Sequence, residues 1–331
     1  MEAKPLDRLI ECVLFVAGLA FGSFLNVCIS RIPRDESIVR PPSHCRACGR
    51  PIRWYDNIPV LGFLLLRGHC RACGSPISYR YPSVELLTAL VFTACYVWYG
   101  PTWLALKFCI FGFLLIGLIF MDAETGLLPR EFTYSGIVIG LAFSWIAYGD
   151  SSATRFLLLL FGKRIPDVHW LSLMDCTLAA LFGAGFFYFA WALYYLARKR
   201  HGMGFGDIAL MAMSGAFLGL KLTALVMFCA PIVAVLYIVV LLVREAFRPK
   251  AGDSAKQTMQ TSAEAESRPL STSSGAEASQ LQSSDVATET VEQRPFLQRE
   301  IPFGVFLGAC SLATIFFGEA AWRWYLGKLH M

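Results

Sequence analysis

Charged residues are scarce in this chain. They form 16% of its 331 residues, whereas hydrophobic residues form 56% and include 26 Phe and 8 Trp. A soluble core cannot hide that much apolar surface, so the composition excludes an ordinary soluble protein and predicts an all-α polytopic membrane protein. The net charge of +5 is modest, and nothing in the sequence indicates a nucleic-acid partner.

Bulky apolar residues are almost missing from one long segment. Between Pro249 and Pro295 the chain consists mainly of Ser, Thr, Ala, Glu and Gln. Such a segment buries too little surface to offset the entropy lost on ordering. We therefore expect residues 249–300 to form a disordered cytoplasmic insert that is dispensable for chemistry.

The remaining apolar segments are long enough to cross a bilayer, since about 20 helical residues span roughly 30 Å of hydrocarbon. A cleaved signal peptide is the alternative for the first of them, but its apolar run continues to Ile29, and we expect it to stay. Residues 149–170 are mixed in character and predict an interfacial loop. We expect about eight transmembrane helices, at 9–30, 84–99, 103–121, 132–148, 171–197, 205–220, 222–243 and 303–325.

These spans divide the chain into five parts. They are a first transmembrane helix (9–30), a polar loop domain (31–82), a transmembrane core (83–248), the insert (249–300) and a last transmembrane helix (301–331). The loop domain is strongly basic, which predicts a cytoplasmic location because basic loops stay on that side of the membrane. Its arginines are Arg31, Arg34, Arg40, Arg46, Arg50, Arg53, Arg67, Arg71 and Arg80, against Asp35, Glu36 and Asp56.

The loop domain also contains four cysteines in two pairs. Cys45 and Cys48 form the first pair, Cys70 and Cys73 form the second, and both pairs have the local sequence Cys-Arg-Ala-Cys-Gly, with 21 residues between them. Two such knuckles complete a tetrahedral thiolate site, so we expect all four to bind a structural Zn²⁺. A redox switch is the alternative, but four thiols in a reducing cytoplasm favour the metal.

Two aspartates interrupt the apolar segments. Asp122 follows one long apolar run, and Asp207 ends the sequence Gly-Met-Gly-Phe-Gly-Asp before another. An ionisable residue at membrane depth indicates a functional site. Counting spans from the basic loop domain puts both aspartates on the cytoplasmic side. The alternative is that each aspartate caps the helix that begins near it.

A pair of carboxylates can hydrolyse an amide bond at neutral pH. One acts as the base that deprotonates water and the other as the acid that protonates the carbonyl oxygen, and close aspartates share one proton. We expect Gly202, Gly204 and Gly206 to leave room beside Asp207 for an extended peptide. Other nearby carboxylates are Glu124 and Glu131, which we expect to be more solvated, and Glu85, either a helix-start carboxylate or a substrate contact.

Several motifs occur in an order that resembles the bacterial type IV prepilin peptidase family, whose members are aspartic membrane proteases of the Gly-x-Gly-Asp type. The resemblance covers nearly the whole chain except residues 149–170 and 249–295. Its motifs are Gly22-Ser23-Phe24-Leu25-Asn26-Val27, Arg31-Ile32-Pro33, the paired cysteines, Asn57-Ile58-Pro59-Val60-Leu61, Ile77-Ser78-Tyr79-Arg80-Tyr81-Pro82, Glu85-Leu86-Leu87, Asp122 with Leu128-Pro129, Gly204-Phe205-Gly206-Asp207 and Ile301-Pro302-Phe303-Gly304.

The resemblance implies a multi-pass protein of the bacterial inner membrane with Asp122 and Asp207 as its catalytic pair. It implies cleavage of the leader peptide of type IV prepilins or type II secretion pseudopilins at the cytoplasmic face. It also implies N-methylation of the new N-terminal residue with S-adenosylmethionine, although the sequence contains no glycine-rich methyl-donor fingerprint and the residues that would bind this donor are unknown.

Two positions depart from the family pattern. Arg130 stands where members usually carry an aspartate after Leu-Pro, and Ala209 where they usually carry a lysine. Both change the charge beside the proposed dyad and bear on substrate range and efficiency. The alternatives are an inactive paralogue or scaffold that binds prepilins without cutting them, and a proton-coupled membrane transporter in which the aspartates relay protons.

Overall fold

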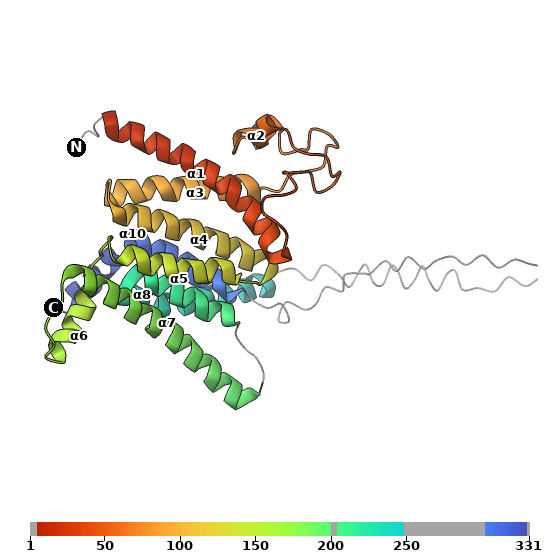
Figure 1. The fold of residues 1–331 in the computed structure, drawn as a ribbon. Helices are drawn as coiled ribbons and strands as arrows, with labels where there is room; N and C mark the ends of the chain where they lie inside the picture. The colour runs from red at the N-terminus through yellow and green to blue at the C-terminus, as the bar shows by residue number, and fades with distance from the viewer. Residues whose placement is uncertain (1–4, 200–203, 248–301, 330–331) are drawn as a thin grey trace, which may run out of the picture. The chain divides into compact units, whose positions relative to one another are not determined.

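The computed structural model describes residues 5–199, 204–247 and 302–329 (Figure 1). The chain divides into two units, Met1–Ala234 with Ile301–Met331, and Val235–Glu300. Of the second unit, only the end of one helix is described. The predicted insert at 249–300 lies outside the described residues.

The described residues are helical and contain no β-strand, apart from two isolated bridges in the loop domain. This confirms the predicted all-α fold of a multi-pass membrane protein. Six helices are long and apolar enough to cross a bilayer. They are α1 (Pro5–Arg31), α3 (Arg80–Tyr99), α4 (Trp103–Thr125), α7 (Val168–Arg198), α8 (Phe205–Ala246) and α10 (Phe303–Leu329).

Two differences separate these six helices from the eight expected spans. The first is α5 (Arg130–Ser144), whose 15 residues reach about 22 Å and so fall short of the hydrocarbon thickness. The second is α8, in which the non-helical conformation of Gly219 separates two helical segments, and these segments correspond to the expected spans 205–220 and 222–243. The mixed segment before α7 contains α6 (Ser152–Leu160), which is too short to cross, as expected.

The break in α8 has a structural cause. Gly219 has φ 76°, a conformation that other residues rarely adopt. The carboxylate of Asp175 accepts a hydrogen bond from the backbone N–H of Leu220 at 3.4 Å and another from Thr154 Oγ1 at 2.5 Å. Asp175 therefore stabilises the backbone just after the break.

Close packing joins the first helices of the bundle, in which α1 lies against α3 and α4 (Figure 1). Gly18 and Gly22 are four residues apart on α1 and face α3. A Cβ at Gly18 would lie 2.5 Å from Ala89 Cα, and one at Gly22 would lie 2.6 Å from Glu85 Cα. Small residues at this spacing let two membrane helices approach to backbone contact.

The loop domain between α1 and α3 contains three short helices, η1 (Ile32–Arg34), η2 (Trp54–Asn57) and α2 (Leu61–Leu65). It is attached to the bundle by hydrogen bonds from buried side chains. Arg31 donates to the carbonyl oxygens of Ser37 and Pro41, and Asn26 donates to that of Tyr81. The bonds of Arg31 fix the start of the loop domain against α1, and the bond of Asn26 joins α1 to the first turn of α3, where the loop domain ends.

Candidate functional site

Asp122 lies in the last turn of α4 and is 6% exposed. Its Oδ2 accepts a hydrogen bond of 2.9 Å from the backbone N–H of Val305 in the first turn of α10. The helix α4 ends just beyond, where Gly126 adopts φ 65° and donates its N–H to the Asp122 carbonyl. Asp122 therefore does not cap α5, the helix that begins next along the chain, whose N-cap is Pro129, but it does bind the N-terminus of α10.

Asp207 is the third residue of α8 and is 8% exposed. Its carboxylate has no hydrogen-bond partner within the part of the chain that the structure describes. It interacts electrostatically with Asp122. The capping alternative for Asp207 therefore has no hydrogen bond to support it among these residues.

Leu128 brings the two aspartates to the same end of the bundle. A Cβ at Gly206 would lie 2.7 Å from Leu128 Cβ, and one at Gly304 would lie 3.0 Å from Leu128 Cδ1. The leucine after α4 thus fills the space between the start of α8 and the start of α10. Asp122, beside Gly304, and Asp207, after Gly206, are positioned by these contacts.

The glycines before Asp207 differ in their surroundings. Gly204 is exposed, and a Cβ there would lie 3.8 Å from the backbone nitrogen of Gly206, an ordinary contact distance. Gly206 instead packs against Leu128, so its lack of a side chain serves helix packing rather than access for a peptide. Gly202 lies outside the described residues.

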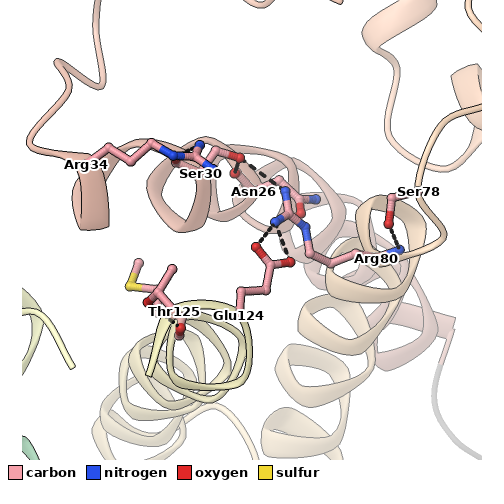
Figure 2. A network of polar contacts seen from close by, with 8 residues as sticks. Asn26, Ser30, Arg34, Ser78, Arg80, Glu124 and Thr125 are labelled. Atoms are coloured by element: carbon pink, nitrogen blue, oxygen red, sulfur yellow. Dashed lines mark hydrogen bonds and ion pairs between the residues drawn. The ribbon is translucent and has the colours of Figure 1, made fainter. Parts of the chain in front are cut away.

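Glu124 forms an ion pair with Arg80, the first residue of α3. Arg80 Nη1 donates to Glu124 Oε1 at 2.6 Å and Arg80 Nη2 donates to Ser30 Oγ at 3.1 Å. Figure 2 shows Arg80 between Ser30 and Glu124, where it links α1, α3 and α4. The Glu124 side chain is 39% exposed, and Glu131 is also exposed.

The other acidic residues lie away from the aspartate pair. Asp150 accepts a hydrogen bond of 2.7 Å from Lys221 in α8, which also pairs with Glu319.

The two positions that depart from the family pattern lie at the starts of helices. Arg130 is exposed at the start of α5. Ala209 lies in the first turns of α8.

Glu85 has a role that the sequence did not indicate. It is 7% exposed, and its Oε2 accepts a hydrogen bond of 2.7 Å from the backbone N–H of Val60 in the loop domain. Val60 has φ 59°, an unusual conformation for a β-branched residue. Glu85 is therefore neither a helix-start carboxylate nor exposed to a substrate, and it connects the loop domain to α3.

The four loop-domain cysteines come together in one cluster. Their sulfur atoms all lie within 4.8 Å of one another, and Cys45 Sγ is 3.9 Å from Cys73 Sγ. Sulfurs around a tetrahedral metal with bonds of about 2.3 Å are about 3.8 Å apart. The cluster can therefore hold one metal ion.

The two knuckles share one backbone fold. In the first knuckle, the carbonyl oxygen of Cys45 accepts a hydrogen bond from the N–H of Gly49, and the N–H of Cys45 donates to the carbonyl oxygen of Arg50. In the second, the carbonyl oxygen of Cys70 accepts from the N–H of Gly74, and the N–H of Cys70 donates to the carbonyl oxygen of Ser75. The backbone N–H groups of Cys48 and Ala47 lower the pKa of the Cys45 thiol, whereas the nearby thiols of Cys73 and Cys45 raise the pKa of Cys48. The first thiolate of the cluster therefore forms readily at Cys45.

A charged contact supports the second knuckle. Arg71 binds both oxygens of Asp56, with Nη2 to Oδ1 at 2.7 Å and Nε to Oδ2 at 2.9 Å. This pairing lowers the pKa of Asp56. The cysteine cluster is thereby attached to η2, and through η2 to α2.

Comparison with known proteins gives the family. Residues 16–99 match the bacterial peptidase A24 N-terminal domain, and residues 109–239 match the type IV leader peptidase family. A prepilin leader peptidase/N-methyltransferase from Myxococcus xanthus is 35% identical over 255 residues, which cover 74% of this chain and 70% of the relative. The chain belongs to the type IV leader peptidase family.

Further relatives of the same name agree with this membership. One from Neisseria gonorrhoeae is 34% identical, covering 68% of this chain and 80% of the relative, and one from Klebsiella pneumoniae is 37% identical, covering 62% and 84%. No solved structure matches the chain. The family indicated by the sequence motifs, and with it a membrane peptidase rather than a transporter, is confirmed.

Proposed function

We propose that this chain cleaves the leader peptide of type IV prepilins or type II secretion pseudopilins and then methylates the new N-terminal residue. Membership of the leader peptidase family supports the cleavage, and the names of the relatives support both activities. The observation that carries the proposal is the pair of buried aspartates at one end of the bundle, Asp122 in α4 and Asp207 in α8.

In the proposed mechanism, the two carboxylates share one proton and divide the work of peptide hydrolysis. One removes a proton from the attacking water and the other protonates the scissile carbonyl oxygen. The bond from Val305 N–H holds one oxygen of Asp122 in place. We expect the carboxylate of Asp207 to bind the water or the peptide.

The proposal includes Zn²⁺ at the cysteine cluster, held by Cys45, Cys48, Cys70 and Cys73. The spacing of the four sulfurs supports a tetrahedral metal, and four protein ligands leave no position for an activated water. The ion would therefore have a structural role in the loop domain and no part in hydrolysis.

We further propose that the loop domain and the aspartate pair face the cytoplasm from the inner membrane. The excess of arginine in residues 31–82 supports this orientation. S-adenosylmethionine would supply the methyl group, and the names of the relatives alone support it.

The cleavage assay uses purified protein in detergent with a prepilin substrate. Asp122→Asn and Asp207→Asn should each abolish cleavage, and Glu131→Gln, an exposed carboxylate near the pair, should retain it. Full processing by either aspartate variant would refute the dyad. Adding labelled S-adenosylmethionine to the same assay tests methyl transfer, and the absence of label on a cleaved product would remove that activity from the proposal.

A further inference from the structure

The short helix α2 exposes a face made entirely of leucine. Leu61, Leu64 and Leu65 are spaced i, i+3 and i+4, which puts them on one side of a helix. Their exposed fractions are 56%, 61% and 75%. The opposite side is packed, since a Cβ at Gly62 would lie 2.2 Å from the carbonyl oxygen of Asp56. A leucine face of this kind is unfavourable in water.

The depth of α2 relative to the membrane follows from its contact with α3. Val60, the residue before α2, donates its N–H to Glu85, which lies five residues inside α3 and so about 8 Å from its start. The helix α3 has 20 residues, about the length needed to cross the hydrocarbon core. The start of α2 therefore lies at or just below the boundary between headgroups and hydrocarbon beside α3, and not out in the solvent.

Aromatic residues next to α2 are also exposed. Trp54 in η2 is 80% exposed, and η2 packs on α2 through the contact between Asp56 and Gly62. Tyr79, just before α3, is 77% exposed, and its ring is 5.4 Å from that of Phe63 in α2. Trp and Tyr are the residues that concentrate where a membrane meets water.

The charge of this region fits an anionic lipid surface. Residues 51–80 contain four arginines and one carboxylate, Asp56, which is already paired with Arg71. Arg53 and Arg67 stand on either side of the segment that contains Trp54 and the leucines. Basic residues beside an exposed apolar helix face are typical of segments that lie in the membrane interface.

We propose that α2 and Trp54 form an interfacial anchor, which inserts the leucine face into the headgroup region of the same bilayer that α1 and α3 cross. The anchor would hold the cysteine cluster against the membrane surface. The inference concerns the loop domain alone and does not depend on which leaflet it faces or on the proposed peptidase activity.

The test measures where Trp54 lies. The full-length protein is placed in nanodiscs of phosphatidylglycerol and phosphatidylcholine, with and without bromine atoms near the top of the acyl chains, which quench nearby tryptophan. The difference between the wild type and Trp54→Phe isolates the fluorescence of Trp54 from that of the other tryptophans. We expect brominated lipid to reduce this difference signal at least twofold, while acrylamide in water reduces it little.

A second variant examines the leucine face. Leu64→Ser with Leu65→Ser should weaken the quenching of Trp54 by brominated lipid and raise its quenching by acrylamide, with the metal content of the cysteine cluster unchanged. Quenching of Trp54 by acrylamide but not by lipid in the otherwise wild-type protein would overturn the proposal. Protection of Trp54 from both quenchers would also overturn it, since a protein partner, such as a second copy, would then cover this face.

Discussion

The carboxylate of Asp122, near the end of α4, accepts a hydrogen bond from the backbone N–H of Val305, which lies 183 residues further along the chain. The bond joins α4 to α10, the helix that follows the predicted insert. Gly304 makes the approach possible, because a Cβ there would lie 2.8 Å from Asp122 Oδ2. The orientation of one proposed catalytic group thus depends on a backbone contact in the last helix.

Gly304→Ala should therefore impair cleavage without unfolding the protein. The new methyl group would push the Asp122 carboxylate out of place, and displacing a catalytic group by about 1 Å can cost about 100-fold in rate. The measurement is the rate of prepilin cleavage in detergent. Gly185→Ala is the matched control, since nothing lies within 4 Å of the added methyl group in α7. Equal rates for the two variants would contradict the role given to Gly304.

Glu85→Ala should loosen the loop domain. It leaves the Val60 N–H without its acceptor and releases a residue held at an unfavourable φ, so we expect a loss of about 1–3 kcal/mol in the free energy of local opening. Hydrogen–deuterium exchange of residues 54–66 measures this opening. Glu85→Gln keeps an oxygen acceptor and should exchange more slowly than Glu85→Ala. Identical exchange in the two variants would show that the hydrogen bond does not hold the loop.

Arg80 and Glu124 should be coupled in stability. The Arg80 side chain is 9% exposed, so Glu124→Gln leaves a buried charge with a weaker partner, while Arg80→Gln removes that charge. We expect the double variant to lose about 1 kcal/mol less than the sum of the two single losses. Thermal unfolding of the four proteins in detergent completes the double-mutant cycle. Strict additivity would mean that the pair contributes nothing measurable.

The sequence predicts some of these features and not others, for a physical reason. The cysteine cluster could be predicted because both pairs of cysteines lie in the same local sequence, so spacing alone indicates the geometry. The contacts of Asp122 with Val305 and of Glu85 with Val60 could not, because each donor is a backbone N–H that any residue except proline supplies. No side-chain pattern marks such a partner.

The span count shows a similar limit. Hydropathy put a boundary at Lys221, whereas the structure breaks α8 two residues earlier, at Gly219. The position of that break depends on Asp175, which comes from α7 and binds the N–H of Leu220. A single-segment hydropathy pattern contains no information about a stabilising carboxylate from another helix, so it indicated the division into two helices but placed the boundary two residues too late.

Removing the metal should affect the loop domain more than the proposed dyad. The cysteine cluster reaches the bundle through Arg71, η2 and the Val60–Glu85 bond, whereas Leu128 and Val305 position the aspartates. Cys45→Ser should therefore lose bound zinc and show rapid hydrogen–deuterium exchange over residues 44–76. It should keep its cleavage rate to within about tenfold, since a structural site supplies folding energy and no reacting atom.

Metal analysis, hydrogen–deuterium exchange and the cleavage assay are run on the same preparation. Cys12→Ser, which changes an exposed cysteine of α1 outside the cluster, is the control and should retain zinc. Complete loss of cleavage in Cys45→Ser, with the helices still folded, would mean that the metal-bearing loop takes part in positioning the substrate or the aspartates.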